Sequence, residues 1–97
     1  MPRALSVSRV SVRAGAEAEY LAAVGELARL AESRGWHLWV FRRPGRPGQY
    51  LEFSESRSPE THRAVTDRPD DERQLEQRIR AVAEYAPGAW DLWEEVG

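Results

Sequence analysis

Two short apolar runs, separated by a segment rich in Pro and Gly, form the clearest pattern in the sequence. The runs cover residues 36–41 and 50–53, and the segment between them reads RRPGRPGQ. Pro and Gly interrupt regular backbone pairing and favour tight turns. Residues 35–56 are therefore predicted to form a β-hairpin.

Side chains alternate between the two faces of each predicted strand. In the second strand, Leu51 and Phe53 share one face, and Tyr50 and Glu52 share the other. If Leu51 and Phe53 face the helices of the fold, Glu52 faces the opposite side of the sheet. The first strand is apolar on both faces, as expected of a strand that is covered on both sides. Its two faces carry Trp36, Leu38 and Val40, and His37, Trp39 and Phe41.

The residues before the hairpin predict a strand and a helix. Residues 4–13 are β-rich, but their apolar positions change parity between Leu5 and Val10. This change indicates a bulge or a strand that starts late. Residues 16–34 repeat apolar side chains at helical spacing, and Gly35 is a natural residue to end that helix.

The residues after the hairpin predict a broken helical region and a last strand. Ser58 and Pro59 form a helix-start signal, and Pro69 would interrupt a continuing helix. We therefore expect a short helix near residues 59–66, a longer one near 70–85 and a last strand at 89–96.

The longer predicted helix has an apolar stripe and a charged side. Glu76 and Arg80, and Arg80 and Glu84, are spaced for exposed ion pairs. The stripe that we expect to be buried consists of Leu75, Ile79, Val82 and Ala86.

The predicted order, β-α-β-β-α-β, is that of the α+β ferredoxin-like fold. The 97 residues are expected to form one domain, 1–97. Right-handed crossovers would put both helices on one face of a four-stranded antiparallel sheet. The other face would carry large apolar side chains without cover. We therefore expect a homodimer in which two sheets pack face to face.

Charge and missing residue types exclude several classes of function. The 14 basic and 16 acidic residues nearly cancel, which gives no electrostatic reason to expect nucleic acid or a membrane as partner. All basic residues are Arg and no Cys is present, so Schiff-base lysines, P-loop lysines and thiolate nucleophiles are excluded. The only histidines, His37 and His62, lack metal-ligand spacing, and no metal is expected. Because no long apolar segment begins the chain, we expect a cytoplasmic protein.

The spacing of several elements resembles one known family. A helix followed by Gly35 and Trp36, a strand at 50–53, and His62 ten residues after Glu52 resemble the dimeric α+β-barrel superfamily of antibiotic-biosynthesis-monooxygenase-like proteins. The resemblance spans nearly the whole chain. Members of that superfamily include cofactor-free oxygenases of polyphenolic substrates and haem-degrading enzymes.

The resemblance implies a small aromatic ligand in a cavity between the sheet and its dimer partner. It implies monooxygenase-like chemistry without a cofactor if the protein is an enzyme. Oxygenase and haem-degrading members are associated with a pocket Asn, whereas this sequence contains no Asn. That difference argues against direct transfer of their mechanisms.

Glu52 and His62 are the candidate catalytic residues. His62 lies where many relatives carry a helix histidine, which implies an acid/base, substrate-binding or axial-ligand role. A helix-capping or ion-paired histidine is the alternative. In an inter-sheet cavity, Glu52 would have a raised pKa and could act as a base. A structural salt bridge with Arg9, Arg13 or His37 is the alternative.

Aromatic side chains supply the candidate substrate-binding residues. Tryptophans can stack on a planar ligand, but they also serve as core or dimer-interface anchors. The candidates are Trp39, Tyr50, His37 and Trp90.

Three arginines, Arg42, Arg43 and Arg46, cluster at the predicted hairpin tip. They suit an anion, but Gly45 and Gly48 do not form a phosphate-binding motif, which favours a solvated tip. Two functions therefore remain open from sequence. One is a small-molecule enzyme or binding protein, and the other is a non-catalytic dimerisation or interaction module whose aromatic residues fill an interface.

Overall fold

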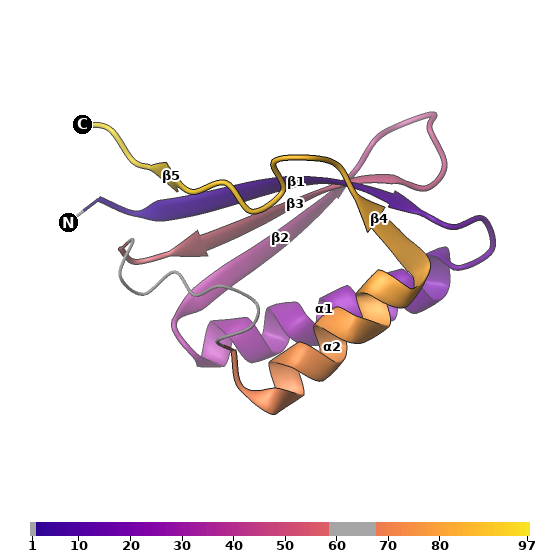
Figure 1. Ribbon diagram of the computed structural model, residues 1–97, viewed down its shortest axis with the longest axis horizontal. Helices are drawn as coiled ribbons and strands as arrows, with labels where there is room; N and C mark the ends of the chain where they lie inside the picture. Colours follow the sequence, from indigo (N-terminus) through magenta and orange to yellow (C-terminus); the bar gives the residue numbers. More distant parts are fainter. Residues whose placement is uncertain (1, 59–67) are drawn as a thin grey trace.

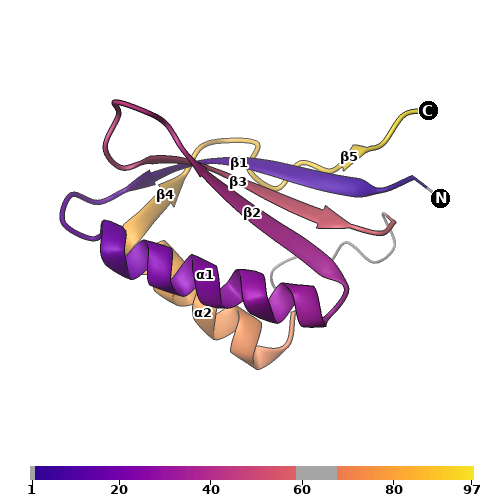
Figure 2. The same cartoon turned by 180° about the vertical axis from the view of Figure 1, so that it is seen from behind.

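An antiparallel sheet forms one layer of the structure, and two helices lie side by side against one of its faces (Figures 1 and 2). The computed structural model describes residues 2–58 and 68–97. Its elements, in chain order, are β1 (Ala4–Val12), α1 (Glu17–Ser33), β2 (Trp36–Arg42), β3 (Gln49–Ser56), α2 (Asp70–Val82), β4 (Ala83–Tyr85) and β5 (Trp93–Glu94).

The sheet has the strand order β2-β3-β1-β4, and β5 also pairs with β1. Each helix therefore connects two strands that have a third strand between them, which is the ferredoxin-like topology. The predicted fold is confirmed, with both helices on the same face (Figure 1). The predicted hairpin is the pair β2 and β3. The short helix expected near residues 59–66 lies outside the described residues.

The C-terminal part of the sheet differs from the prediction. A single strand was expected at 89–96, but two short pieces pair with opposite ends of β1. β4 pairs with Val10–Val12, and β5 pairs with Ala4 and Leu5. Between them, Pro87 has no backbone N–H and Gly88 has φ +82°, so regular pairing cannot continue.

β1 contains no bulge, contrary to one reading of its sequence. Its register against β3 is continuous from Ala4 to Ser11. The apparent change of parity has another cause. Ser6 and Ser8 lie on the helix-facing side with Val10, while Leu5 lies on the opposite side.

The hydrophobic core fills the space between the helices and the β4 end of the sheet. Its largest fully buried side chains are one aromatic and three aliphatic residues contributed by α1, α2 and β1. These are Tyr20, Leu27, Ile79 and Val10. The helix α1 ends as predicted, because Gly35 adopts the left-handed φ of +87° just beyond it.

Backbone hydrogen bonds of Gly48 connect the hairpin turn to β1 and α1. Its carbonyl accepts a 2.8 Å hydrogen bond from the Val12 amide, and its own amide donates to the Glu17 carboxylate at 2.8 Å. Gly48 has φ +79°, and a Cβ at this position would lie 2.8 Å from the Val12 carbonyl oxygen. Only a residue without Cβ fits this close approach.

We expect Gly48→Ala to destabilise the fold more than Gly45→Ala. Both positions have left-handed φ values, +79° and +72°, but a Cβ at Gly45 meets no atom within 4 Å. The left-handed conformation costs an alanine about 1–2 kcal/mol at either site. The backbone collision at Gly48 should add a further loss of about 1–3 kcal/mol in the free energy of unfolding. Urea denaturation of the two variants measures the difference, and equal losses would contradict the close approach.

Candidate functional site

Small polar side chains line part of the helix-facing side of the sheet. Ser6 and Ser8 of β1 and Ser54 and Ser56 of β3 are all buried there. Because partners across a ladder point to the same side, the paired residues Val7 and Phe53 lie together on the opposite side. In this part of the sheet, polar groups face the interior and apolar groups face outward.

Glu52 occupies the centre of this polar interior. It lies on β3 between Ser8 of β1 and Val40 of β2, and only 6% of its surface is exposed. The Tyr20 hydroxyl donates to its Oε2 at 2.7 Å. The Tyr85 hydroxyl lies 2.9 Å from Oε1 and 3.0 Å from Oε2. Helix α1, strand β3 and strand β4 therefore converge on one carboxylate.

Burial raises the pKa of Glu52 to about 7, from an ordinary value of 4.5. The two tyrosine hydrogen bonds oppose this rise because they favour the charged form, and the nearby charge of Glu76 adds to it. Burial, followed by the charge of Glu52, raises the pKa of Tyr20 and of Tyr85. Both tyrosines therefore remain protonated donors while Glu52 changes charge near neutral pH.

A second buried carboxylate, Glu76 of α2, belongs to the same interior. Its Oε1 accepts a 2.8 Å hydrogen bond from Arg68, and both side chains are almost fully buried. The Arg68 guanidinium also lies 4.5 Å from the centre of the Trp36 ring, in a cation–π arrangement. Burial raises the pKa of Glu76, although the charge of Arg68 opposes the rise.

Two buried oxygen atoms of this interior have no hydrogen-bond partner among the described residues. They are Oε2 of Glu76 and Oγ of Ser54. A buried polar atom without a partner costs about 1–3 kcal/mol. Such atoms in a native protein commonly bind water or a ligand. Here one is an acceptor and the other can both donate and accept.

The geometry suits proton transfer and the binding of a polar group. A carboxylate with a pKa near 7 can accept a proton at neutral pH and release it again. Perturbed carboxylates with defined partners in a protein interior are typical of functional sites. No group of three or more side chains within residues 2–58 and 68–97 has the geometry of a metal site.

The structure corrects the orientation of two predicted site residues. Glu52 and Tyr50 were expected to face away from the helices, but both are buried on the helix-facing side. Leu51 and Phe53 take the opposite side, where they pair with Phe41 and Trp39 of β2. The prediction was wrong because Leu51 and Phe53, the bulkier apolar residues of this part of β3, were assumed to face the core.

The partners of these residues also differ from those expected. Glu52 binds two tyrosines instead of Arg9, Arg13 or His37. The Tyr50 hydroxyl donates to Glu17 at 2.8 Å. His37 contacts Glu55, with its Nδ1 3.1 Å from the carboxylate.

The remaining aromatic candidates make their ring contacts with residues other than Glu52. Trp39 is 45% exposed on the helix-free face and stacks on His37, with ring centres 5.5 Å apart. Trp90 follows β4 and lies between Tyr85, at 5.1 Å, and the Arg80 guanidinium, at 5.3 Å. His62 lies outside the described residues.

Sequence reasoning missed Tyr20, Tyr85 and Glu76 as site residues. Glu76 was expected on the exposed side of its helix with Arg80, but it is buried and pairs with Arg68. The spacing of Leu75, Glu76 and Ile79 carried the relevant signal, because residues three and four apart share a helix face. Tyr20 lies within the helical apolar pattern of residues 16–34, but nothing in its position indicated a carboxylate partner.

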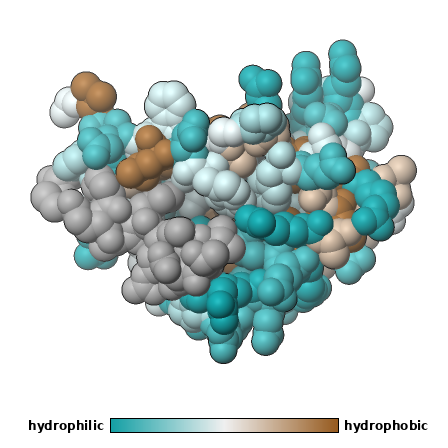
Figure 3. Space-filling model, in the orientation of Figure 1, coloured by the Kyte–Doolittle hydropathy of each residue, from teal (hydrophilic) through white to brown (hydrophobic). Residues whose placement is uncertain are grey.

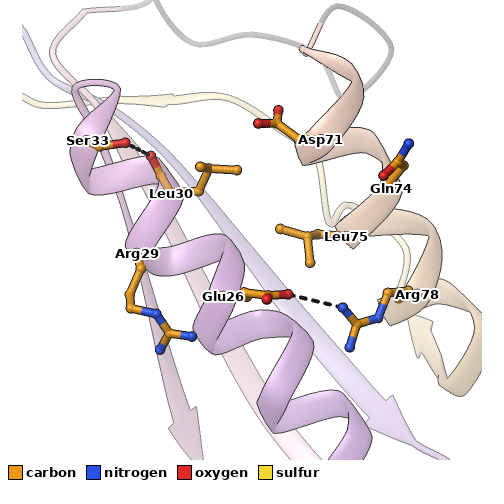
Figure 4. Close-up of a pocket in the computed structure, with 8 residues that line it drawn as sticks. All are labelled: Glu26, Arg29, Leu30, Ser33, Asp71, Gln74, Leu75 and Arg78. Carbon is orange, nitrogen blue, oxygen red and sulfur yellow. Dashed lines mark hydrogen bonds and ion pairs between the residues drawn. The ribbon is translucent and has the colours of Figure 1, made fainter.

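A separate hollow lies between α1 and α2 on their outer side (Figure 4). Its volume is about 530 Å³. Leu30 and Leu75 point into it, and an ion pair between Glu26 and Arg78 crosses one end. It shares no lining residue with the Glu52 cluster.

No helix in the described part of the chain has the length and apolar character needed to cross a membrane.

Solved structures with the same architecture include three bacterial proteins. SnoaB, a cofactor-independent oxygenase from Streptomyces nogalater, superimposes with a TM-score of 0.77 and 16% identity over 100% of this chain and 94% of that one. This similarity shows that the two chains share a fold. A protein of unknown function from Bacteroides thetaiotaomicron gives a TM-score of 0.77 and 16% identity, covering 96% of this chain and 95% of that one.

An antibiotic-biosynthesis-monooxygenase-like protein from Bordetella bronchiseptica gives a TM-score of 0.71 and 16% identity over the whole of both chains. The resemblance found in the sequence is thus confirmed for the fold. No protein-family model matches the chain, and no curated protein matches it in sequence.

We expect the stability of the protein to fall between about pH 4.5 and pH 7 because of Glu52. The folded state holds this proton up to a pKa of about 7, whereas the unfolded chain releases it near 4.5. The stabilisation is fully present below about pH 4.5 and is lost as the pH rises through 7, an effect of about 3 kcal/mol. Glu52→Gln, which resembles the protonated form, should remove most of this dependence.

Urea denaturation at a series of pH values tests this expectation. Glu19→Gln, on the exposed side of α1, is the matched control and should keep the pH dependence of the unsubstituted protein. Some dependence should remain in Glu52→Gln, because the pKa of Glu76 is also raised. If Glu52→Gln keeps the pH dependence of stability of the unsubstituted protein, the pKa of Glu52 is not raised and the expectation is wrong.

Proposed function

We propose that the protein binds a small aromatic molecule carrying a hydroxyl group in the polar interior around Glu52, and oxidises it in a monooxygenase-like reaction without a cofactor. The observation that carries this proposal is the buried Glu52 carboxylate, whose pKa is raised to about 7. The proposed site lies between the sheet and the helices. It replaces the inter-sheet cavity expected from the sequence, because Glu52 faces the helices.

Glu52 is assigned the role of general base. At neutral pH a substantial fraction of the carboxylate is ionised and can take the proton of an acidic phenol or enol. The resulting anion is a stronger electron donor than the neutral molecule, as a reaction with O₂ without a metal or flavin requires. Tyr20 and Tyr85 hold the carboxylate in place through their hydroxyls.

Glu76 and Ser54 are assigned the recognition of polar groups on the ligand. Their oxygens have no hydrogen-bond partner among the described residues and are buried in the same interior. A hydroxyl of the ligand would relieve this otherwise costly burial. Arg68 orients Glu76 through a 2.8 Å contact, and its charge favours the ionised form of Glu76. A ligand with at least two hydroxyl groups fits this arrangement of acceptors.

The fold similarity to SnoaB supports the class of reaction. The absence of Asn from this chain means that another residue must supply the polar contacts to the substrate that the resemblance attributes to a pocket Asn. Glu52 is the residue that combines burial, defined donors and a pKa near the working pH. The proposal therefore shares the reaction class of the relatives but assigns it a different polar group.

We expect Glu52→Gln to lower kcat at least about 100-fold, the usual effect of removing a general base. The measurement is O₂ consumption with a panel of polycyclic phenols, with products identified by mass spectrometry. Activity of the unsubstituted protein should rise with pH through about 7, because the base must be ionised. Glu19→Gln, on the surface of α1, should retain activity.

Tyr85→Phe separates a catalytic role of Glu52 from a structural one. Loss of this hydroxyl removes a hydrogen bond that lowers the pKa of Glu52. The midpoint of the pH–rate profile should therefore move to higher pH. If no phenol on the panel is bound or consumed while the protein is folded, the proposed function fails and the non-catalytic alternative gains support.

We further propose that the helix-free face of the sheet is covered by a second copy of the chain. Aromatic side chains of the hairpin, Trp39 and Phe41, are 45% and 56% exposed there, and Trp93 of β5 is 60% exposed. The ladder places Trp39 beside Phe53, and Phe53 beside Val7, so the apolar positions are contiguous. In contrast, the region of α2 is largely hydrophilic (Figure 3).

Polar residues border this apolar patch at one end. Arg3 contacts Glu55 at 2.9 Å and Glu95 at 2.7 Å, and His37 contacts Glu55 at 3.1 Å. An apolar centre with a polar rim is the usual composition of a protein–protein interface. An exposed patch of this kind seldom remains uncovered.

We expect sedimentation equilibrium to give a molecular mass twice that of one chain, which is 11.1 kDa. Trp39→Glu places a charge in the apolar centre and should raise the dissociation constant of the dimer about 100-fold or more. Leu21→Glu, at a residue of α1 that is 37% exposed, is the control and should leave the dimer intact. A monomeric unsubstituted protein in sedimentation equilibrium at micromolar concentration would contradict the proposed interface.

A further inference from the structure

A hollow at the tip of the hairpin is rich in arginine. Its volume is about 300 Å³, and Arg42, Arg43 and Arg46 line it together with Leu21 and Tyr50. The sequence placed these arginines at a solvated turn. The structure adds a wall from α1, which the turn approaches because Glu17 binds the amide of Gly48.

The charge of this hollow is unbalanced. Among the described residues, no carboxylate forms a salt bridge with Arg42, Arg43 or Arg46. Glu17 is the one acidic residue that lines it. Three guanidinium charges against one carboxylate leave an excess of two positive charges.

The single carboxylate is already engaged. Glu17 accepts hydrogen bonds from the Gly48 amide and from the Tyr50 hydroxyl, each at 2.8 Å. These contacts, with a smaller contribution from the charge of Arg42, lower the pKa of Glu17. Glu17 therefore organises the wall of the hollow and does not neutralise Arg43 or Arg46.

The backbone that carries the arginines is held by hydrogen bonds. The Arg43 amide donates to the Gln49 carbonyl at 3.0 Å, and the Gln49 amide donates to the Arg46 carbonyl at 3.2 Å. The Arg46 amide donates to the Arg43 carbonyl at 3.3 Å. Groups presented from a fixed backbone lose less conformational freedom when a ligand binds.

We propose that this hollow binds a phosphate monoester of a small organic molecule. A phosphate monoester carries a charge of about −2 near neutral pH, which matches the excess of two positive charges. Guanidinium groups bind phosphate oxygens in pairs with favourable geometry. Leu21 and Pro47 form an apolar wall against which the organic part of the ligand packs.

The size of the hollow restricts the ligand. About 300 Å³ lies at the lower limit of ordinary small-molecule sites, which range from about 300 to 1,000 Å³. A phosphate attached to one ring fits, whereas a large cofactor does not. The hollow shares no lining residue with the Glu52, Glu76 and Ser54 cluster, so the two sites can be tested independently.

Calorimetric titration with phenyl phosphate tests this assignment, with inorganic phosphate and benzoate titrated at the same ionic strength. Phenyl phosphate should bind with saturation, and benzoate should bind more weakly because it carries one charge. The double variant Arg43→Gln/Arg46→Gln should weaken phenyl phosphate at least about tenfold through loss of charge-assisted hydrogen bonds. Arg42 is retained in this variant to preserve its neighbours Glu17 and Tyr50.

The control removes the same charge elsewhere. Arg29→Gln/Arg73→Gln, at exposed helix positions, should change the affinity less than about twofold. Glu52→Gln should leave phenyl phosphate binding unchanged, whatever its effect on oxidation. The proposal fails if phenyl phosphate does not saturate by about 10 mM, if both double variants weaken binding equally, or if benzoate binds as tightly. Because the side chains substituted in the two double variants are all exposed, circular dichroism should show that both double variants are folded.

Discussion

The burial of the Glu52 carboxylate between two tyrosine hydroxyls is the interaction on which the rest of the arrangement depends. A carboxyl group in the layer between sheet and helices is costly unless it is hydrogen-bonded or protonated. The chain meets this requirement with Tyr20 of α1 and Tyr85 of β4, at 2.7 Å and 2.9 Å. The two tyrosines lie 32 and 33 positions from Glu52. Both crossovers of the fold must therefore form before the group is satisfied.

The polarity of one part of the sheet is reversed, and this reversal separates two surfaces. On the helix-facing side, serines and carboxylates replace the apolar residues that usually fill a two-layer core. On the other side, Trp39, Phe41 and Phe53 are displayed from the hairpin. The proposed binding site for a polar molecule and the proposed apolar association surface therefore lie on opposite faces of the same strands. A substitution on one face does not directly contact the other face, so its effect can be assigned to the face that carries it.

The order of elements and the hairpin were predictable from the sequence because they rest on local signals. Pro and Gly fix the turn, helical spacing fixes α1, and Gly35 ends it. The direction in which Glu52 points was not predictable from alternation alone. Alternation shows which residues share a face, but it does not show which face is inside. The serines of β1 and β3 gave no indication, because Ser is common on either side of a strand. The contact between Tyr85 and Glu52 depends on β4, which the sequence pattern assigned to the end of a helix.

The last strand position is occupied by two short pieces, β4 with three residues and β5 with two, instead of one long strand. A long regular edge presents a row of free amides and carbonyls on which further strands can add, and such addition leads to uncontrolled polymerisation. Here the Ala86 amide donates to Arg9 and the Ser8 hydroxyl donates to Ala89, so the gap between the two pieces is partly closed. This edge offers no continuous template to another chain. The protein can display a broad aromatic face while one side of its sheet remains protected from fibril-like growth.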